Sequence, residues 1–207
     1  MAVITISREL GSNGQQIVDL LCDELGYCRV DKALLSQIAR EAGIDVKAVL
    51  AKERDVASKP RLISDQMTSL YGRQPGAFGR EGEIDDQTYI KVVRDTMERF
   101  AREGDAIIVG RGGQLVLRDW PGALHVHLYA PLEVRAERLV DRYNVTKLDA
   151  QRRIERSDER KRAYLRNIHR NANWKDLKYY HLAINTQYLT PAIVAQLILV
   201  AAHESKT

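Results

Sequence analysis

Residues 4–17, ITISRELGSNGQQI, are the most informative segment of this 207-residue chain. The apolar, β-branched start of the segment predicts a strand over residues 3–7, and apolar residues three and four positions apart predict a helix over residues 15–25. Gly11 and Gly14 lie in the turn between them. Glycines in such a turn can direct successive backbone N–H groups at an anion, at the positively polarised start of the helix. The segment therefore predicts a phosphate-binding loop, and an ordinary strand-to-helix turn is the alternative.

Further short apolar runs alternate with helical patterns along the chain. They predict strands at residues 27–30, 106–109, 124–129 and 180–184. Helices are predicted at residues 33–41, 132–143 and 191–202, the last with Thr190 as its N-cap and Pro191 in its first turn. Because strands that alternate with helices pair in parallel through crossover connections, we predict an α/β fold with a five-stranded parallel sheet.

Two segments, residues 45–103 and 146–170, are mostly helical by pattern but do not fit this alternation. Residues 71–85 within the first segment contain four glycines and a proline, which is typical of a loop. The second segment is rich in arginine. We predict that both are appendages of a single domain, residues 1–207, and that they close over substrates.

Composition favours a soluble, cytoplasmic protein. The chain is 44% hydrophobic, enough for a full core, and its start, MAVITISREL, lacks the pattern of a signal peptide. No stretch approaches the roughly 20 apolar residues that cross a bilayer. Cys22 and Cys28 are predicted to be reduced, buried thiols. His125 and His127 share one face of a strand, where packing is favoured over a metal pair, and no metal-ligating residue is predicted.

The excess positive charge is concentrated in one part of the chain. The net charge is +4, and residues 131–171 contain twelve Lys or Arg against seven Asp or Glu. Such clustering indicates a polyanionic partner, and a solvated helix with i,i+4 ion pairs is the alternative. Nucleic-acid binding is a less favoured hypothesis, which the nearby aromatic residues would support as stacking platforms: Tyr143, Tyr164, Trp174, Tyr179 and Tyr180.

The predicted loop departs from the standard phosphate-binding pattern G-x-x-x-x-G-K-[ST]. Glu9 stands at the first glycine position, Gln15 at the lysine position and Gln16 at the position of the hydroxyl that holds magnesium. No acidic residue follows the strand at residues 106–109 to orient a metal ion. Arg8 could replace the missing lysine charge, and magnesium could be held by waters and the phosphates themselves.

Six segments carry a resemblance to a known family: ITISRELGSNGQQI, VDKALLSQIA, AIIVGRGG, HVHLYAPLEVRAERL, RIERSDERKR and YYHLAINT. In this order, over nearly the whole chain, they resemble the cytidylate kinase-like family. The resemblance implies a three-layer P-loop kinase core of α/β class. It also implies a helical insertion at residues 45–103 that binds the phosphoryl acceptor, and an arginine-rich helical lid at residues 144–172.

The resemblance also implies roles for individual residues on the ATP side. Backbone amides of four loop residues would bind the donor phosphates, with Arg8 as a nearby cation: Gly11, Ser12, Asn13 and Gly14. Four further residues complete the predicted donor site: Gln15, Gln16, Arg135 and Arg138, the last two on one helical face by their i,i+3 spacing.

On the acceptor side, the resemblance implies that Asp31, Arg111 and Asp158 bind the substrate. Arg111 lies between glycines in GRGG, and its forked guanidinium suits the acceptor phosphate; a surface arginine is the alternative. Three lid arginines are predicted to stabilise the charge of the transferring group, in addition to Arg8: Arg160, Arg162 and, in reserve, Arg156.

The implied activity is in-line transfer of the γ-phosphoryl group of ATP, with Mg²⁺, to a nucleoside monophosphate such as CMP or to a related phosphorylated small molecule. Because Gln15 cannot replace a lysine, the alternative is a catalytically weak nucleotide-binding sensor or regulator of the same fold. The sequence does not specify the acceptor or the oligomeric state.

Overall fold

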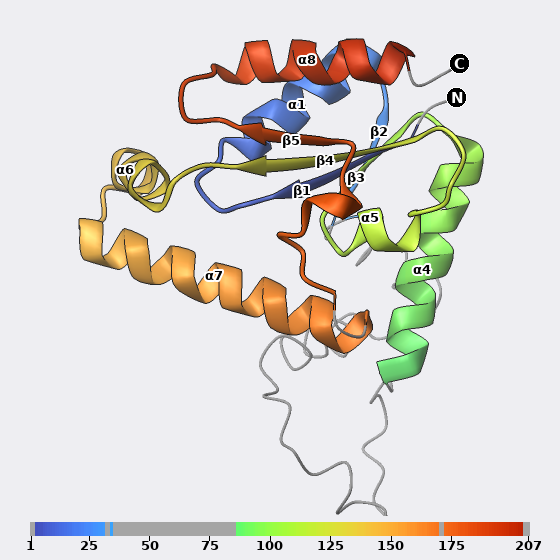
Figure 1. Ribbon diagram of the computed structural model, residues 1–207, viewed down its shortest axis with the longest axis horizontal. Coiled ribbons are helices and arrows are strands. Elements are labelled where there is room, and N and C mark those ends of the chain that lie inside the picture. Colours follow the sequence, from blue (N-terminus) through green and yellow to red (C-terminus); the bar gives the residue numbers. More distant parts are fainter. Residues whose placement is uncertain (1–2, 32–33, 35–85, 170–171, 205–207) are drawn as a thin grey trace, which may run out of the picture.

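The computed structural model describes residues 3–31, 34, 86–169 and 172–204 (Figure 1). The predicted helix at residues 33–41 lies almost entirely outside the described residues. The same holds for most of the predicted insertion at residues 45–103, including its loop at 71–85. The described end of that insertion is the helix α4 (Asp86–Glu103).

The centre of the molecule is a five-stranded parallel sheet of order β2-β3-β1-β4-β5. Its strands are β1 (Val3–Arg8), β2 (Cys28–Val30), β3 (Ala106–Val109), β4 (Ala123–Tyr129) and β5 (Leu182–Asn185). The predicted α/β fold with five parallel strands is thus confirmed. β5 begins two residues later than predicted, because Tyr180 closes a short 3-10 turn (Leu177–Tyr179) by donating its N–H to the Leu177 carbonyl.

Helices cover both faces of the sheet (Figure 1). α1 (Gly14–Leu25) and α8 (Pro191–Glu204) pack on one face, while α4, α5 (Gly113–Val116) and α7 (Lys147–Ile168) lie on the other. Side chains alternate along each strand, so Ile4 and Ile6 join the α1 and α8 core while Val3 joins the opposite one. α6 (Leu132–Tyr143) packs against α7 at the edge. The three-layer arrangement follows from this alternation.

The two histidines of β4 are packing residues. Both are buried on the sheet face opposite α1 and α8. Nδ1 of His125 lies 2.8 Å from Thr5 Oγ1, and the His125 ring stacks on His181. The His127 ring stacks on Tyr180. Burial lowers the pKa of each to about 4. Within the described part of the chain, no group of three or more His, Cys, Asp or Glu side chains could hold a metal ion.

Smaller expectations are met in part. Thr190 caps α8 as predicted, since its hydroxyl accepts a hydrogen bond from the N–H of Ile193. Cys22 and Cys28 are free thiols, but Cys28 is exposed, because it begins the edge strand β2. No helix in the described ranges is long and apolar enough to cross a membrane.

Candidate active site

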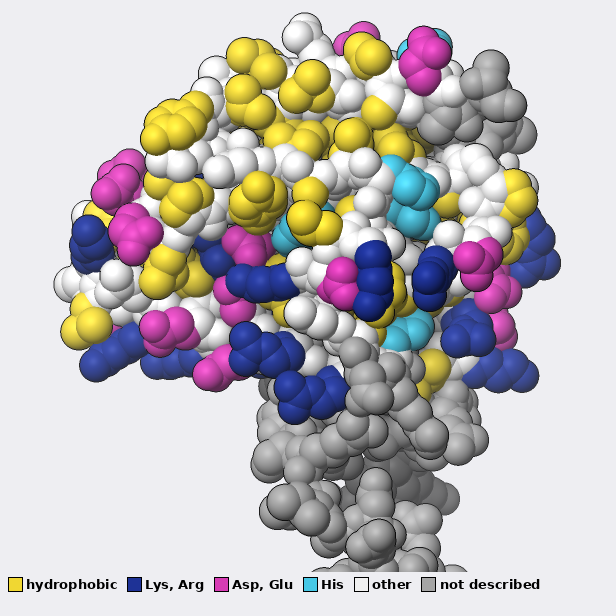
Figure 2. Space-filling view, in the orientation of Figure 1, with side chains coloured by type: hydrophobic (Ala, Val, Ile, Leu, Met, Phe, Trp, Pro, Cys, Tyr) yellow, Lys and Arg dark blue, Asp and Glu magenta, His cyan; other side chains and the backbone are white. Residues whose placement is uncertain are grey.

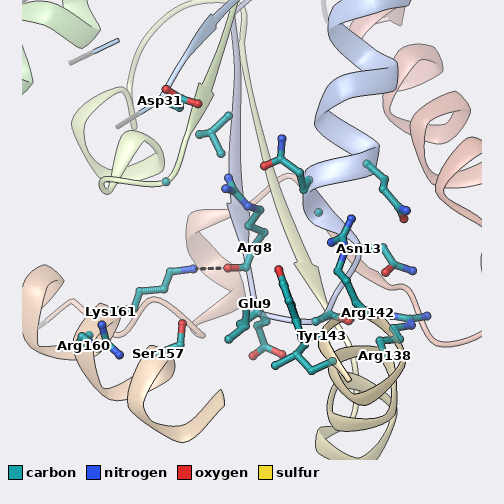
Figure 3. Close-up of a pocket in the computed structure, with 18 of the residues that line it drawn as sticks. Arg8, Glu9, Asn13, Asp31, Arg138, Arg142, Tyr143, Ser157, Arg160 and Lys161 are labelled. Atoms are coloured by element: carbon teal, nitrogen blue, oxygen red, sulfur yellow. Dashed lines mark hydrogen bonds between the residues drawn. The ribbon is translucent and has the colours of Figure 1, made fainter. Parts of the chain in front are cut away.

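A cavity of about 1160 Å³ opens where β1, β2 and β3 end (Figure 3). Its floor is formed by the glycine-rich loop, residues 9–14, which runs from the end of β1 into the first residue of α1 and lines the cavity except at Ser12. Residues that follow β2 and β3 form one wall, and parts of α6 and α7 form the others. Ligands of parallel α/β sheets bind at the carboxyl ends of the strands, so this cavity lies where the fold places a binding site.

The glycines of the loop serve two different purposes. Gly11 has φ +86°, in the left-handed region, and a Cβ there would lie 2.7 Å from the Arg135 carbonyl oxygen. Gly14 has no such angle, but a Cβ there would lie 2.6 Å from Cδ of Arg8. Gly11 is therefore required by its backbone angle and by the close approach of Arg135, whereas Gly14 is required by space alone. Asn13 takes the second left-handed position, with φ 57°, directly before α1.

Ser12 braces the loop from within. Its side chain is fully buried, and its hydroxyl and its backbone N–H both donate to the carbonyl of Glu9, at 2.8 and 3.2 Å. Ser12 does not line the cavity. The other predicted donor-site residues of the loop and of the first turn of α1 do line it: Gly11, Asn13, Gly14, Gln15 and Gln16.

Gln15, at the position of the usual lysine, is held in a network with α1 and β2. Its amide donates to Asp19 Oδ1 at 2.9 Å and accepts from Nη2 of Arg29 at 2.9 Å. Arg29 also pairs with Asp19 at 2.6 Å. Both ends of the Gln15 amide thus have protein partners.

A buried ion cluster joins the glycine-rich loop to α6 and α7. The Arg135 guanidinium, from α6, donates to Glu9 Oε2 at 2.9 Å, to Asp158 Oδ1 at 2.9 Å and to the Leu10 carbonyl at 2.7 Å. Lys175 lies 3.0 Å from the other oxygen of Glu9. Neither Arg135 nor Asp158 lines the cavity. Each nitrogen of Arg135 has a protein partner, so the structure places this predicted donor-site residue, and Asp158 with it, beneath the site.

Arg138 has a different position one turn along α6. It lines the cavity and donates to the Gly11 carbonyl at 3.2 Å. It also donates to the carbonyl and hydroxyl of Thr186, at 2.5 and 3.0 Å, in the segment after β5. Burial lowers the pKa of Arg138, which remains charged. Arg138 therefore ties the glycine-rich loop to the segment after β5.

Asp31 and Arg111 follow the adjacent strands β2 and β3 and line the same cavity. Asp31 pairs with Arg29 at 2.9 Å and accepts a bond from the N–H of Leu34. Arg111 has φ 54°, and its guanidinium lies over the Tyr164 ring of α7, 5.1 Å from the ring centre. The structure thus brings together these two predicted acceptor-site residues.

Of the predicted lid arginines, only Arg160 lines the cavity. Arg156 and Arg162 are exposed and lie outside the lining. Arg162 is two residues from Arg160 and so lies on a different side of α7, whereas Arg156 lies one helical turn before Arg160. Two further cations line the cavity that the sequence patterns did not indicate. Nζ of Lys161 donates to Ser7 Oγ at 2.9 Å and to the Arg8 carbonyl at 3.2 Å (Figure 3), and Arg142 lines the cavity from α6.

The cavity is strongly cationic. Its lining contains three acidic residues, Glu9, Asp31 and Asp141, against six basic ones: Arg8, Arg111, Arg138, Arg142, Arg160 and Lys161. Lys and Arg side chains also gather over α7 on the surface, interspersed with acidic ones (Figure 2). A concave cationic site suits a polyphosphate.

The five aromatic residues proposed as stacking platforms differ in exposure. Trp174 is 1% exposed and Tyr164 is 6% exposed, so neither ring is available to an extended strand of bases. Tyr143, by contrast, is 53% exposed.

Comparisons with known proteins agree with this geometry. The model of the cytidylate kinase-like family matches residues 3–188. A cytidylate kinase from Pyrococcus horikoshii is 30% identical over 141 residues, which cover 68% of this chain and 71% of that protein.

Two solved structures share the fold at low sequence identity. An uncharacterized protein from Eubacterium ventriosum superimposes with a TM-score of 0.69 at 17% identity, covering 98% of this chain and 99% of that chain. A shikimate kinase from Bacteroides thetaiotaomicron superimposes with a TM-score of 0.52 at 10% identity, covering 98% of each chain. The fold is that of the P-loop kinases.

Proposed function

Because the chain belongs to the cytidylate kinase-like family, we propose that it transfers the γ-phosphoryl group of ATP to a nucleoside monophosphate, with CMP as the first acceptor to test. A related phosphorylated small molecule is the other acceptor class that the proposal covers. The supporting observation is that one cationic cavity contains the glycine-rich loop together with Asp31 and Arg111, which follow neighbouring strands.

The proposed donor site is the glycine-rich loop and the start of α1. Backbone amides of Gly11, Asn13 and Gly14 would bind the phosphates of ATP, helped by the positive end of the helix. Arg138 and Arg142 add positive charge from α6. Ser12 and Arg135 would act indirectly, by holding the loop in shape.

The proposed acceptor site lies across the cavity. Arg111 would bind the acceptor phosphate through two parallel N–H groups, and Asp31 would accept a hydrogen bond from the nucleoside. Arg160, from the lid helix, would neutralise charge that develops on the transferring group. The transfer is an in-line displacement without a covalent enzyme intermediate, so positioning and charge are the protein's main contributions.

Magnesium supplies charge neutralisation at the phosphates in kinases of this type. The donors present here do not form a protein cage for it, since Gln16 replaces the usual hydroxyl and the described residues contain no suitable acidic cluster. The proposal therefore assigns no step to a protein-bound metal, and the ion would enter with ATP.

Transfer of radiolabel from the γ-position of ATP to a panel of CMP, dCMP, UMP, AMP and GMP tests the proposal. We expect one labelled diphosphate product to dominate. ATP binding without transfer to any of them would contradict a nucleoside monophosphate as the acceptor.

A second candidate function has one observation in its favour. Gln15 has no positive charge and its amide is engaged with Asp19 and Arg29, so the usual lysine contact to the phosphates is missing from this position. A nucleotide sensor of the same fold needs to bind but not to accelerate transfer. Tight ATP binding with no detectable transfer is the result that would favour the sensor.

A further inference from the structure

We propose that Lys161 of α7 provides the ammonium charge at the bound triphosphate that a lysine at position 15 would otherwise provide. The inference rests on the nucleotide-binding part of the proposed function. It does not require that transfer is fast.

The position of Lys161 supports this assignment. Its side chain extends from the lid helix toward the last residue of β1, and it lines the cavity beside the glycine-rich loop (Figure 3). Nζ lies 2.9 Å from Ser7 Oγ and 3.2 Å from the Arg8 carbonyl oxygen. It therefore reaches the start of the loop from the lid side, whereas a standard lysine reaches the loop from α1.

The charge of Lys161 has no ionic partner among the described residues. The neighbouring carboxylates are already paired, since Glu9 binds Arg135 and Lys175, and Asp158 binds Arg135. Nζ instead lies 3.9 Å from the centre of the Trp174 ring. Lys161 is partly buried, and an ammonium that is largely removed from water requires compensation. Because the side chain also lines the cavity, an anionic ligand there is the natural counterion.

Titration makes this role measurable. Burial lowers the pKa of Lys161 to about 7; the charges of Glu9 and Asp158 oppose this shift, while those of Arg8 and Lys175 add to it. His127 also faces Lys161, but it is neutral at this pH because its own pKa is about 4. An anion beside the ammonium raises its pKa, so binding above pH 7 requires uptake of a proton.

The test is the affinity of the full chain for MgATP, measured by isothermal titration calorimetry. We expect Lys161→Met to weaken binding about 10- to 100-fold, as expected for loss of one charged hydrogen bond. Lys175→Met is the matched control, because Lys175 likewise lies over the Trp174 ring but pairs with Glu9 and does not line the cavity. We expect it to change the affinity by less than about threefold.

The pH profile separates a ligand contact from a structural role. Wild-type affinity should fall as pH rises from 6 to 8, and this fall should be absent in Lys161→Arg, because a guanidinium stays protonated. This profile tests the proposal even if Lys161→Met fails to fold.

Equal losses in Lys161→Met and Lys175→Met, or a wild-type pH profile in Lys161→Arg, would overturn the proposal for Lys161 alone. Absence of MgATP binding in the wild type would instead refute the proposed function together with the inference.

Discussion

The cationic side chains around the cavity reach it from several elements, and their positions predict different kinetic effects. Arg160 extends from α7, and under the proposed function it contacts the transferring group when α7 covers both substrates as a lid. Arg111 lies in the turn after β3, beside the predicted acceptor site. Substitution of Arg160 should therefore change mainly kcat, and substitution of Arg111 should change mainly the KM for the acceptor.

Arg160→Ala should lower kcat by about 100-fold or more and change KM little, because charge on the transferring group is stabilised mainly in the transition state. Steady-state kinetics with ATP and the best acceptor measure both constants. Arg152→Ala is the control, since Arg152 is an exposed arginine of the same helix outside the cavity lining. Unchanged turnover in Arg160→Ala would remove Arg160 from the mechanism.

Arg111→Lys should raise KM for the acceptor by about 10-fold or more and leave KM for ATP unchanged, because an ammonium cannot make the two parallel bonds of a guanidinium. Arg118→Lys provides the comparison. Arg118 also lies over a tyrosine ring, at 5.9 Å, but is exposed and outside the cavity lining. An equal rise in KM for both substrates would argue against an acceptor-phosphate contact.

At the scale of elements, the ion cluster of Glu9, Arg135 and Asp158 connects three parts of the site. It joins the glycine-rich loop, α6 and α7 through a guanidinium that is only 4% exposed. The backbone of Arg135 also packs so closely on the loop that a Cβ at Gly11 would lie 2.7 Å from the Arg135 carbonyl oxygen. The shape of the loop therefore depends on the helix that crosses it.

Arg135→Met should lower the free energy of unfolding by about 3–5 kcal/mol, because it leaves Glu9 and Asp158 buried with too little positive charge. Urea denaturation measures the loss. Arg99→Met is the control, since Arg99 pairs with Glu103 at 3.9 Å on the surface and should contribute less than about 1 kcal/mol. Adding Asp158→Asn to Arg135→Met should recover part of the loss, and a further fall would contradict an electrostatic cause.

At the scale of the whole molecule, the stability should depend on two histidines buried between the sheet and its covering layer. His125 and His127 have pKa values lowered to about 4 by burial, against about 6.5 in an unfolded chain. Above pH 6.5 both states are neutral. Below it the unfolded state binds protons first, so stability is lost as pH falls from 6.5 to about 4.

Each histidine should contribute a loss of about 3 kcal/mol across this interval. His127→Phe should remove the part of this loss that His127 contributes, because Phe fits the aromatic stack with Tyr180 and cannot bind a proton. Chemical denaturation at pH 7 and pH 4.5 compares the variant with the wild type. His203→Gln, at an exposed site on α8, should keep the wild-type pH dependence. The prediction for His127 is wrong if His127→Phe keeps it too.

Much of the fold could be predicted from local patterns. The apolar runs give the positions of all five strands to within two residues, since the period of side chains along a strand is set by the backbone. Lys161 was harder to find, because a lysine in a charged helix looks like a solvated residue. A signal was nevertheless present: Ile154, Lys161 and Tyr164 follow the helical spacing of the inward face of α7.

The sequence alone determined the parallel sheet, the glycine-rich turn after its first strand and the family to which the chain belongs, because these depend on periodicity and on contiguous motifs. Only the tertiary structure decided which charges meet. Glu9, Arg135 and Asp158 are far apart along the chain yet form one buried cluster, while Arg160 and Lys161 are adjacent and reach the cavity differently. Charge pairing depends on the distance between side chains in space and on their burial, and neither is encoded in local sequence spacing.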